Sequence, residues 1–263
     1  MNKPDPDQFA TSSKGQSNFS GGGIAVVGSD FGCGKTVVTA AIAHILARSN
    51  AVRALKPILS GSRQKAEAEV SFISAISGSP RGYAFCFSER PARLTRSQWL
   101  SAVSAVHSSI DLTIVETFGA VGSPIFVEDS DGAVLVSDTA DFVRRLSFPV
   151  LLVANHREDA PERLLSAAAL AQNRGLDVLG LLTVETQSGE GQVLENRYSR
   201  QDVEQVFKTR SQAPYLGCIK YSPSINVQRV NQGNLIKMTE SGVDLLALYK
   251  CMAEFGIDVA VAK

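Results

Sequence analysis

Lys35 and Thr36 are the first residues of this sequence whose types and spacing indicate chemistry. They end the glycine-rich run GSDFGCGKT (residues 28–36), which follows an apolar segment and precedes a helical pattern. A glycine-rich turn between a strand and a helix directs backbone N–H groups and the positive end of the helix dipole toward an anion. In such a loop the lysine can reach the β- and γ-phosphates of a nucleotide, and the threonine hydroxyl can bind Mg²⁺. We predict that the nucleotide contacts Asp30, Phe31, Gly32, Cys33, Gly34, Lys35, Thr36 and Val37.

The loop departs at one position from the strict phosphate-binding pattern G-x-x-x-x-G-K-[ST]. Ser29 stands where that pattern has its first glycine. Gly32 and Gly34 remain, and residues without a side chain let the backbone approach phosphates closely. We expect the loop geometry to tolerate Ser29. The alternative is a strand-turn-helix segment that contains Gly-Lys-Thr without binding a nucleotide.

A second lysine and a carboxylate stand at the ends of two further apolar runs. Lys56 lies in RALKPILSG (residues 53–61), and Glu116 directly follows the run 112–115. In an open α/β sheet, ligands bind at the carboxyl ends of the strands. Lys56 is therefore expected to face the ligand, and Glu116 to join the Mg²⁺ site. Pro57 is expected to end its strand. The alternative for Lys56 is a solvated lysine at a strand end.

The segments that must position these residues alternate between strand and helix patterns. The apolar runs are continuous, as in parallel strands that are covered on both faces. We predict an α/β fold with one doubly wound, mostly parallel sheet and helices on both faces, of the P-loop NTPase type. The predicted strands are Ile24–Val27, Val52–Leu55, Leu112–Val115, Val150–Val153, Val178–Leu182 and Tyr215–Ile219, and the predicted helices include 64–76, 96–107, 160–173 and a C-terminal helix.

Composition and charge exclude several classes of protein. The chain has 263 residues, a hydrophobic content of 44%, and a formal net charge of +0, so no overall field favours nucleic acid or an anionic membrane. It contains no apolar run of about 18 residues and no secretory signal pattern. We expect residues 1–20 to form a polar, disordered tail and residues 21–263 to form one P-loop domain. The cysteines (Cys33, Cys86, Cys218 and Cys251) are far apart, as is typical of free thiols in a cytoplasmic protein.

Three segments together resemble the dethiobiotin synthetases. That family has G-T-D-T-x-x-G-K-T in its loop, K-P-V-x-S-G after the next strand, and V-E-G-A-G-G-x-x-[TS]-P after a later one. In this sequence the matching residues are Gly28, Asp30, Gly34, Lys35 and Thr36 in the first segment, Lys56, Pro57, Ser60 and Gly61 in the second, and Val115, Glu116, Gly119, Ser123 and Pro124 in the third. The resemblance covers residues 23 to about 225.

The resemblance implies an ATP- and Mg²⁺-dependent ligase of biotin biosynthesis. Such an enzyme carboxylates the diamine 7,8-diaminononanoate with CO₂, phosphorylates the carbamate with ATP and closes a cyclic urea. It also implies a homodimer with active sites at the subunit interface. The implied catalytic residues are Lys35, Lys56 and Ser60, the substrate contacts are Lys56, Ser60, Gly119 and Ala120, and the Mg²⁺ ligands are Thr36, Glu116 and Glu69, with Glu67 as the alternative to Glu69. A solvated helix carboxylate is the other interpretation of Glu69.

The resemblance weakens where the family binds the substrate tail and the base. The family holds a substrate carboxylate at a helix N-terminus, where this chain reads NHREDAPERLL (residues 155–165). Asp159 and Glu162 have capping-box spacing, so a capping Asp159 would compete with that carboxylate. This segment is either an ordinary capped helix, with His156 structural, or a site for an altered tail. The larger Phe118 replaces a small family residue, Val184 replaces the base-reading asparagine, and Lys220 replaces a proline; ATP is still expected.

Three functions remain open at this point. The first is a diverged dethiobiotin synthetase. The second is a related ATP-dependent ligase or carboxylase that acts on a different amine, which Phe118 and the acidic segment 157–162 favour. The third is a nucleotide-dependent switch or a non-catalytic binding protein. Switch ATPases of the partitioning type carry an early lysine in K-G-G-x-G-K-[ST], and this loop has none before Lys35.

Overall fold

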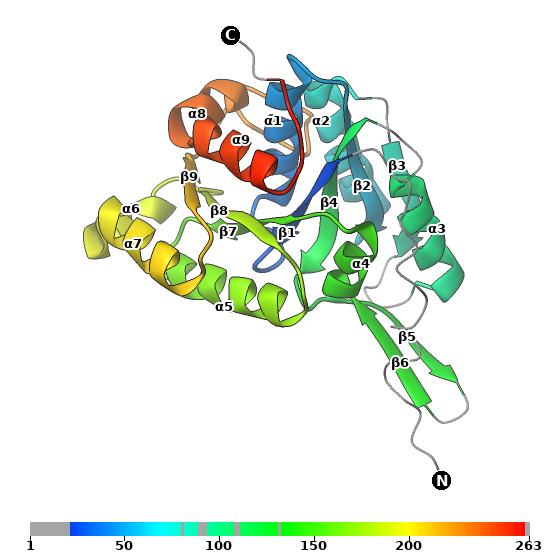
Figure 1. Cartoon of the computed structure of the whole chain (residues 1–263). Helices are drawn as coiled ribbons and strands as arrows, with labels where there is room; N and C mark the ends of the chain where they lie inside the picture. The colour runs from blue at the N-terminus through cyan, green and yellow to red at the C-terminus, as the bar shows by residue number, and fades with distance from the viewer. Residues whose placement is uncertain (1–21, 80–81, 89–93, 108–110, 131–132, 261–263) are drawn as a thin grey trace.

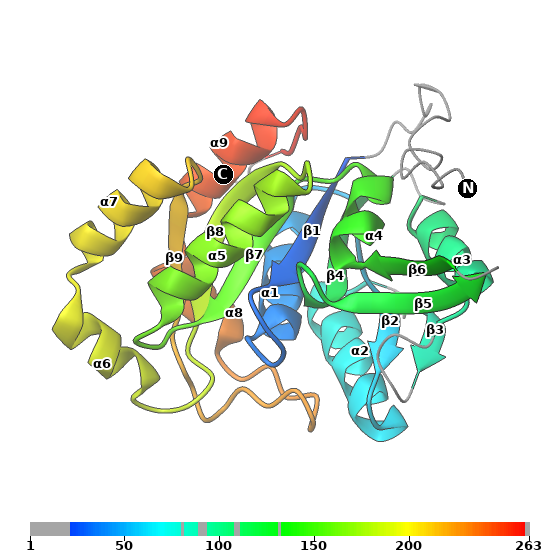
Figure 2. The same cartoon turned by 90° about the horizontal axis from the view of Figure 1, so that it is seen from below.

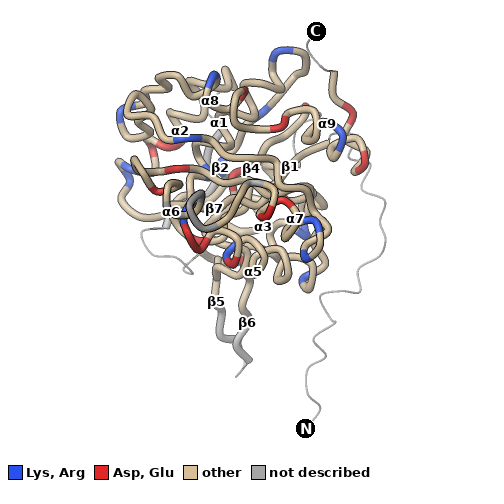
Figure 3. Tube along the Cα trace, turned by 90° about the vertical axis from the view of Figure 1, so that its left-hand side faces the viewer, with Lys and Arg blue, Asp and Glu red and all other residues tan. Residues whose placement is uncertain are grey.

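A computed structural model describes residues 22–79, 82–88, 94–107, 111–130 and 133–260. The predicted polar tail, residues 1–20, lies outside this range. Acidic and basic residues are interspersed along the described chain (Figure 3), in keeping with its formal net charge of +0. No helix among the described residues combines the length and the apolar character needed to cross a membrane.

A seven-stranded sheet forms the centre of the molecule (Figures 1 and 2), and every neighbouring pair in it is parallel. The fold class predicted from the apolar runs is therefore confirmed. Two neighbouring central strands, Gly23–Gly28 and Val150–Asn155, are buried along their whole length, which explains their continuous apolar sequence. In spatial order the strands are β3 (Gly82–Ser88), β2 (Val52–Ser60), β4 (Leu112–Ala120), β1 (Gly23–Gly28), β7 (Val150–Asn155), β8 (Val178–Val184) and β9 (Tyr215–Ile219).

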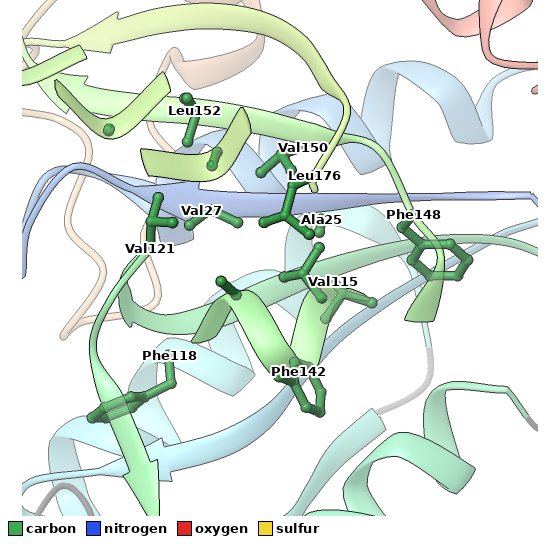
Figure 4. Packing of buried hydrophobic residues seen from close by; sticks show 14 of the residues in the cluster. Ala25, Val27, Val115, Phe118, Val121, Phe142, Phe148, Val150, Leu152 and Leu176 are labelled. Carbon is green, nitrogen blue, oxygen red and sulfur yellow. The ribbon is translucent and has the colours of Figure 1, made fainter. Parts of the chain in front are cut away.

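Helices cover both faces of this sheet (Figure 1). One face is covered by α1 (Lys35–Ala47), α2 (Arg63–Ser77), α8 (Leu235–Gly242) and α9 (Leu245–Glu254). The other is covered by α3 (Arg96–Val106), α4 (Thr139–Leu146), α5 (Ala160–Asn173) and α7 (Arg200–Arg210). Figure 4 shows part of the second layer, in which Ala25 and Val27 of β1 lie among apolar side chains of β4, β7 and α4. The two buried clusters fix the sheet from both sides and so fix the positions of the strand ends.

Several elements were not predicted from the sequence. They are β3, the antiparallel pair β5 (Pro124–Ser130) and β6 (Ala133–Asp138), and the helices α4, α6 (Glu190–Arg197), α7 and α8. The β5–β6 pair projects from the body of the molecule (Figures 1 and 3). Helix α4 begins with a reciprocal capping box between Asp138 and Asp141. The sequence contains this signal, but the helix has only 8 residues and is too short to show a clear helical pattern.

The expectation that Pro57 ends its strand is wrong. Strand β2 continues through Pro57 to Ser60. Pairing of β2 with β4 stops at Leu55, and the register with β3 shifts between Lys56 and Ile58. A proline has no N–H to donate, so it is tolerated where the ladder is already interrupted. The strand therefore delivers Lys56, Ile58 and Ser60 along one continuous extended segment.

Candidate functional site

A cavity of about 430 Å³ lies at the carboxyl ends of β1, β2, β4, β8 and β9. This is the edge at which open parallel sheets bind ligands. Its lining includes the glycine loop from Phe31 to Val37, alternate residues of β2 from Lys56 to Ser60, and β4 from Glu116 to Gly119. At the other end it is lined by 184–186 and 219–222. The cavity therefore joins the segments that the sequence analysis selected independently.

The glycine loop leaves the N-terminus of α1 open to an anion. Gly34 is the N-cap residue of α1 and has a φ of 95°, and Gly32 has a φ of 71°, both in the left-handed region that glycine adopts without strain. No described side chain caps α1, and its first turn contains no acidic residue. The first N–H groups of a helix have no intrahelical partner, so here they and the helix dipole are available to a phosphate.

Ser29 fits this loop without strain. Its φ is not positive, unlike those of Gly32 and Gly34, so its position does not require glycine. Its backbone N–H donates to the carbonyl of Val153 at 2.8 Å, which fixes the start of the loop to β7. The departure from the strict pattern that the sequence shows at Ser29 is therefore compatible with the loop geometry.

Lys35 lies inside the loop rather than in solvent. Its side chain is buried, and its Nζ donates to the backbone carbonyl of Asp30 at 3.3 Å and lies 4.0 Å from the Sγ of Cys33. Burial raises the pKa of the Cys33 thiol, although the nearby Lys35 opposes this effect, so Cys33 is neutral at pH 7. The positive charge of Lys35 therefore lies inside the phosphate loop.

Four predicted residues form one buried polar cluster beside the loop. The Nζ of Lys56 lies 2.5 Å from Oε1 of Glu116 and 2.6 Å from Oε2 of Glu69. The hydroxyl of Thr36 donates to the same Glu116 oxygen at 3.0 Å. These residues come from β2, β4, α2 and α1, so the fold gathers them from positions up to 80 residues apart. Glu67 does not join them; it is exposed and faces Arg63.

The charges of this cluster stabilise one another. The side chain of Glu116 is 1% exposed and that of Lys56 is 11% exposed. Burial alone would lower the pKa of Lys56, but the carboxylates of Glu116 and Glu69 outweigh burial and raise this pKa above its ordinary value. The second carboxylate oxygen of Glu116, Oε2, is buried without a described hydrogen-bond partner. A buried carboxylate oxygen in this state can accept a ligand.

An irregularity in β4 positions Glu116 and Phe118. Val26 pairs with Glu116 but Gly28 pairs with Ala120, so β4 carries two extra residues opposite β1. Gly119 has a φ of 59°, and a side chain there would collide with the hydroxyl of Ser123. Bulges of this kind redirect side chains next to binding sites. Here Glu116 and Phe118 both line the cavity: Glu116 faces Lys56, and Phe118 contacts Phe31 with a ring-centroid distance of 5.5 Å and an interplanar angle of 76°.

The predicted substrate contacts are divided between two places. Lys56, Ser60 and Gly119 line the cavity. Ala120 does not; it lies in a neighbouring groove between the loop and α5, and its N–H donates to Ser123 at 2.8 Å. The side chain of Asp30 also points toward this groove, where its carboxylate pairs with Arg163 at 2.5 Å.

The expected capping role of the Asp159 side chain is wrong. Asp159 is the N-cap residue of α5, but its side chain makes no capping hydrogen bond. Its Oδ2 instead accepts from Nε of Arg163 at 2.6 Å. The guanidinium of Arg163, which the sequence analysis missed, competes better for the carboxylate because a charged donor forms a stronger hydrogen bond than a neutral N–H. The i, i+4 spacing of Asp159 and Arg163 on a helix was the available signal.

The far end of the cavity has an apolar floor and a partly exposed ion pair. Val184 packs against Gly34, since a methyl group added at Gly34 would lie 2.8 Å from the Cβ of Val184. Glu185 pairs with Lys220 at 3.1 Å and accepts from the N–H of Tyr221 at 3.0 Å. The residue that replaces the family proline, Lys220, is thus held by a carboxylate from the neighbouring strand end.

His156 belongs to the sheet rather than to the cavity. It is buried, and its Nδ1 forms a hydrogen bond of 2.8 Å with the hydroxyl of Thr183 on β8. Thr183 in turn bonds to the hydroxyl of Tyr215 on β9 at 2.7 Å. This arrangement matches the structural interpretation of His156.

A family model described as an AAA domain, AAA_26, matches residues 22–229. The chain belongs to this family. The family includes dethiobiotin synthetase. The matched range contains the glycine loop, Lys56, Glu116 and the base end of the cavity. The AAA_26 assignment supports nucleotide binding at the loop without specifying a substrate. No curated protein matches the chain.

Solved structures with low sequence identity share the fold of this AAA_26 chain. A chain of the MinC:MinD cell division protein complex from Aquifex aeolicus is 14% identical, with a TM-score of 0.54, over 92% of this chain and 99% of that one. The septum site-determining protein MinD of Pyrococcus horikoshii OT3, complexed with Mg-ADP, is 13% identical, with a TM-score of 0.52, over 89% and 95%. The cell division ATPase MinD of Pyrococcus furiosus is 15% identical, with a TM-score of 0.50, over 90% and 98%. The P-loop NTPase fold is therefore confirmed.

Proposed function

We propose that this chain is an ATP- and Mg²⁺-dependent ligase that activates a carbamate, as in dethiobiotin synthesis. The observation that carries the proposal is the cluster of Thr36, Lys56, Glu69 and Glu116 beside an uncapped phosphate loop. A site that binds a nucleotide without transferring a phosphoryl group needs only the lysine of the phosphate loop. A second, buried lysine beside the phosphate position supplies the additional charge that transfer of a phosphoryl group to an acceptor requires.

The oxygen atoms of the cluster fit Mg²⁺. Mg²⁺ prefers oxygen ligands and retains several waters, so it needs only one or two carboxylates besides phosphate oxygens. Glu116 offers a buried Oε2 without a described partner, and the hydroxyl of Thr36 donates to the other oxygen of the same carboxylate, Oε1. Glu69 is the third candidate ligand through its contact with Lys56. When bound, the ion would neutralise phosphate charge during transfer.

The protein's own groups have separable roles in the proposed reaction. The open N–H groups of α1 and the ammonium of Lys35 bind the phosphates of ATP. Lys56 stabilises the carbamate and the phosphoryl group as it moves, and Ser60 orients the acceptor by a hydrogen bond. The side chains of Phe31 and Phe118 cover one side of the cavity and limit the access of water to the transferring group.

The proposed steps balance in atoms and charge. An amine of the substrate adds to CO₂ and releases a proton, which gives a carbamate. A carbamate oxygen then attacks the γ-phosphorus of ATP and takes the phosphoryl group, and ADP is the leaving group. The second amine attacks the activated carbonyl carbon, inorganic phosphate leaves and a proton is lost, so that the product is a cyclic urea. We also propose a homodimer, on the resemblance alone.

Phosphate release tests the proposal directly. The protein is incubated with MgATP and bicarbonate, with and without 7,8-diaminononanoate, and the product is identified by mass. We expect diamine-dependent release and a cyclic urea. Lys35→Met, Lys56→Met and Glu116→Gln should each slow release by about 10²-fold or more, whereas Lys250→Met on the exposed side of α9 serves as the matched control. ATP binding without amine-dependent release would refute ligase activity with this diamine.

A nucleotide-dependent switch is the second candidate function. The fold shared with MinD favours it. The loop sequence argues against it, because Asp30, which pairs with Arg163, lies in the early part of the loop where the switch pattern has a lysine. Nucleotide-dependent dimerisation without any acceptor-dependent turnover would support the switch.

A further inference from the structure

Phe31 is an unusual side chain for a phosphate loop. It is 60% exposed, although it lines the cavity beside the loop glycines. Single exposed apolar residues are common on protein surfaces and need no explanation by themselves. This ring, however, has a neighbour: it packs against Phe118 in a T-shaped arrangement, and its tip lies 3.0 Å from the position that a Cβ at Gly119 would occupy. A supported aromatic ring at the mouth of a cavity is a surface on which a ligand can pack.

Two further apolar side chains extend this surface. Ile58 of β2 is 3% exposed and Phe118 of β4 is 5% exposed, and both line the same cavity. Ile58 lies two residues from Lys56 and two from Ser60 along β2, so it separates the two polar groups that are proposed to contact the acceptor. Phe31, Ile58 and Phe118 therefore form an apolar wall around the place where the acceptor must meet the phosphoryl group.

Two of the three described cations that line the cavity are paired with carboxylates, and the third belongs to the phosphate loop. Of the described residues that line the cavity, the cations are Lys35, Lys56 and Lys220. Lys56 is held by two carboxylates, and Lys220 pairs with Glu185 at the opposite end. Lys35 lies within the loop, where its charge serves the phosphates.

The neighbouring groove contains the N-terminus of α5, which no described side chain caps, but carboxylates surround it. Its described cation is Arg163, whose guanidinium is bound by Asp30 at 2.5 Å and by Asp159 at 2.6 Å. Glu162 adds another carboxylate to the same groove. A substrate carboxylate placed there would meet like charges and would have to displace an existing ion pair, which is unfavourable.

We propose that the acceptor of this site is an amine on an uncharged apolar body, which packs against Phe31, Phe118 and Ile58 and lacks a terminal carboxylate. Phe31 is the residue that selects it. The proposal rests on the proposed function and assigns its substrate class. It differs from the acid-tailed diamine that the family resemblance implies.

A matched pair of diamines tests the tail. The first is 7,8-diaminononanoate, and the second is 2,3-diaminooctane, which keeps the two adjacent amines and the alkyl chain but lacks the carboxylate. Phosphate release is measured with MgATP and bicarbonate for both. We expect kcat/KM to be about tenfold or more higher for 2,3-diaminooctane, within the range that a single pocket contact gives. A higher kcat/KM for the acid would overturn this inference and leave the ligase function intact.

Variants of Phe31 test the selecting residue. The measured quantity is the ratio of kcat/KM for 2,3-diaminooctane to that for 2,3-diaminobutane, which keeps the two adjacent amines but lacks most of the alkyl body, so that contacts with the nucleotide and the amines cancel. Phe31→Ala removes the exposed ring and should reduce this ratio by about tenfold, the effect of losing one well-packed apolar side chain. Phe31→Leu should retain most of the ratio. Phe255→Ala, at the end of α9 and 38% exposed, is the control and should not change it. An unchanged ratio in Phe31→Ala would overturn the role of Phe31.

Direct binding separates failure of this inference from failure of the ligase function. If neither diamine stimulates phosphate release, the ligase function with these diamines is refuted. Calorimetry with the full chain, Mg²⁺ and a non-hydrolysable ATP analogue then ranks the two diamines. Tighter binding of 2,3-diaminooctane that Phe31→Ala weakens would still support the apolar acceptor site. Equal binding of both, or no binding of either, would overturn it.

Discussion

The ion pair between Lys56 and Glu116 permits a quantitative test of the site geometry. The substitution Lys56→Met keeps the length of the side chain but removes the ammonium that lies between the carboxylates of Glu116 and Glu69. Glu116 is almost fully buried, so water cannot replace the lost cation at its Oε1. The hydroxyl of Thr36 then remains its described hydrogen-bond partner.

The expected loss of stability follows from burial. Removing one partner of a buried ion pair costs about 3–5 kcal/mol, because the other charge remains uncompensated. Glu69 is 30% exposed and stays hydrated, so the lower end of this range applies. At roughly 2–4 °C per kcal/mol for a domain of this size, Lys56→Met should lower Tm by at least about 6 °C.

Thermal unfolding at pH 7, followed by circular dichroism, measures this effect. The matched control is Arg48→Met, which breaks an exposed ion pair. The side chain of Arg48 is 42% exposed and that of its partner Glu240 is 40% exposed. That substitution should cost less than about 1 kcal/mol. The double variant Lys56→Met/Glu116→Gln should recover part of the loss, since a neutral amide is cheaper to bury than a carboxylate. A Tm of Lys56→Met equal to that of Arg48→Met would refute the buried cluster.

Three further outcomes are expected from the same structure. Lys56→Met should bind Mn²⁺ without nucleotide about tenfold (~1.4 kcal/mol) more tightly by electron paramagnetic resonance, because no ammonium competes for the two carboxylates; equal affinity would contradict this. Gly34→Ala should lower stability by about 1–2 kcal/mol in thermal unfolding and should weaken nucleotide binding in calorimetry, since φ is 95° and Val184 lies against the added methyl group. Burial raises the pKa of Glu190, but hydrogen bonds from the N–H of Thr186, the guanidinium of Arg157 and the N–H of Gln187 outweigh burial and lower this pKa below 4.5. The stability that Glu190 contributes is therefore present above pH 4.5 and is lost as the pH falls further. The stability difference between the wild type and Glu190→Gln should therefore shrink below pH 4.5 in acid titrations, and a constant difference would argue against these hydrogen bonds.

The parallel strands could be predicted because burial on both faces leaves a simple pattern. Each of the six predicted strands lies within a strand of the structure, although β1, β2, β4, β7 and β8 extend past the predicted ends. These extensions contain proline, threonine, glycine and asparagine, which the apolar criterion rejects. They remain extended because neighbouring strands and the site hold them. The expected end at Pro57 failed for this reason, since a locally unfavourable residue occurs where the ladder is interrupted.

The membership of the site could also be predicted, because motif spacing on successive strand ends limits which side chains can meet. Lys56 and Glu116 were expected at one edge of the sheet, and the structure brings them within 2.5 Å. The pairing of Arg163 with Asp30 could not be predicted in this way. It joins positions 133 residues apart, on a loop and a helix whose relative placement depends on the packing of α5 against the sheet.

The orientation of side chains at the strand ends depends on two register shifts. One is in β4 opposite β1, and the other is between β2 and β3 next to Lys56. In a regular strand the side chains of residues two apart point to the same face, so Glu116 and Phe118 would share one environment. Both line the cavity here, but the carboxylate beside the bulge meets Lys56, whereas the aromatic ring meets Phe31. The shift places two extra residues of β4 opposite β1, and no local sequence pattern specifies where it occurs. The same bulge therefore positions both the polar, phosphate-facing part of the cavity and its apolar wall. For this reason the charged residues of the site can be predicted from the motifs. The acceptor, in contrast, has to be inferred from the three-dimensional arrangement.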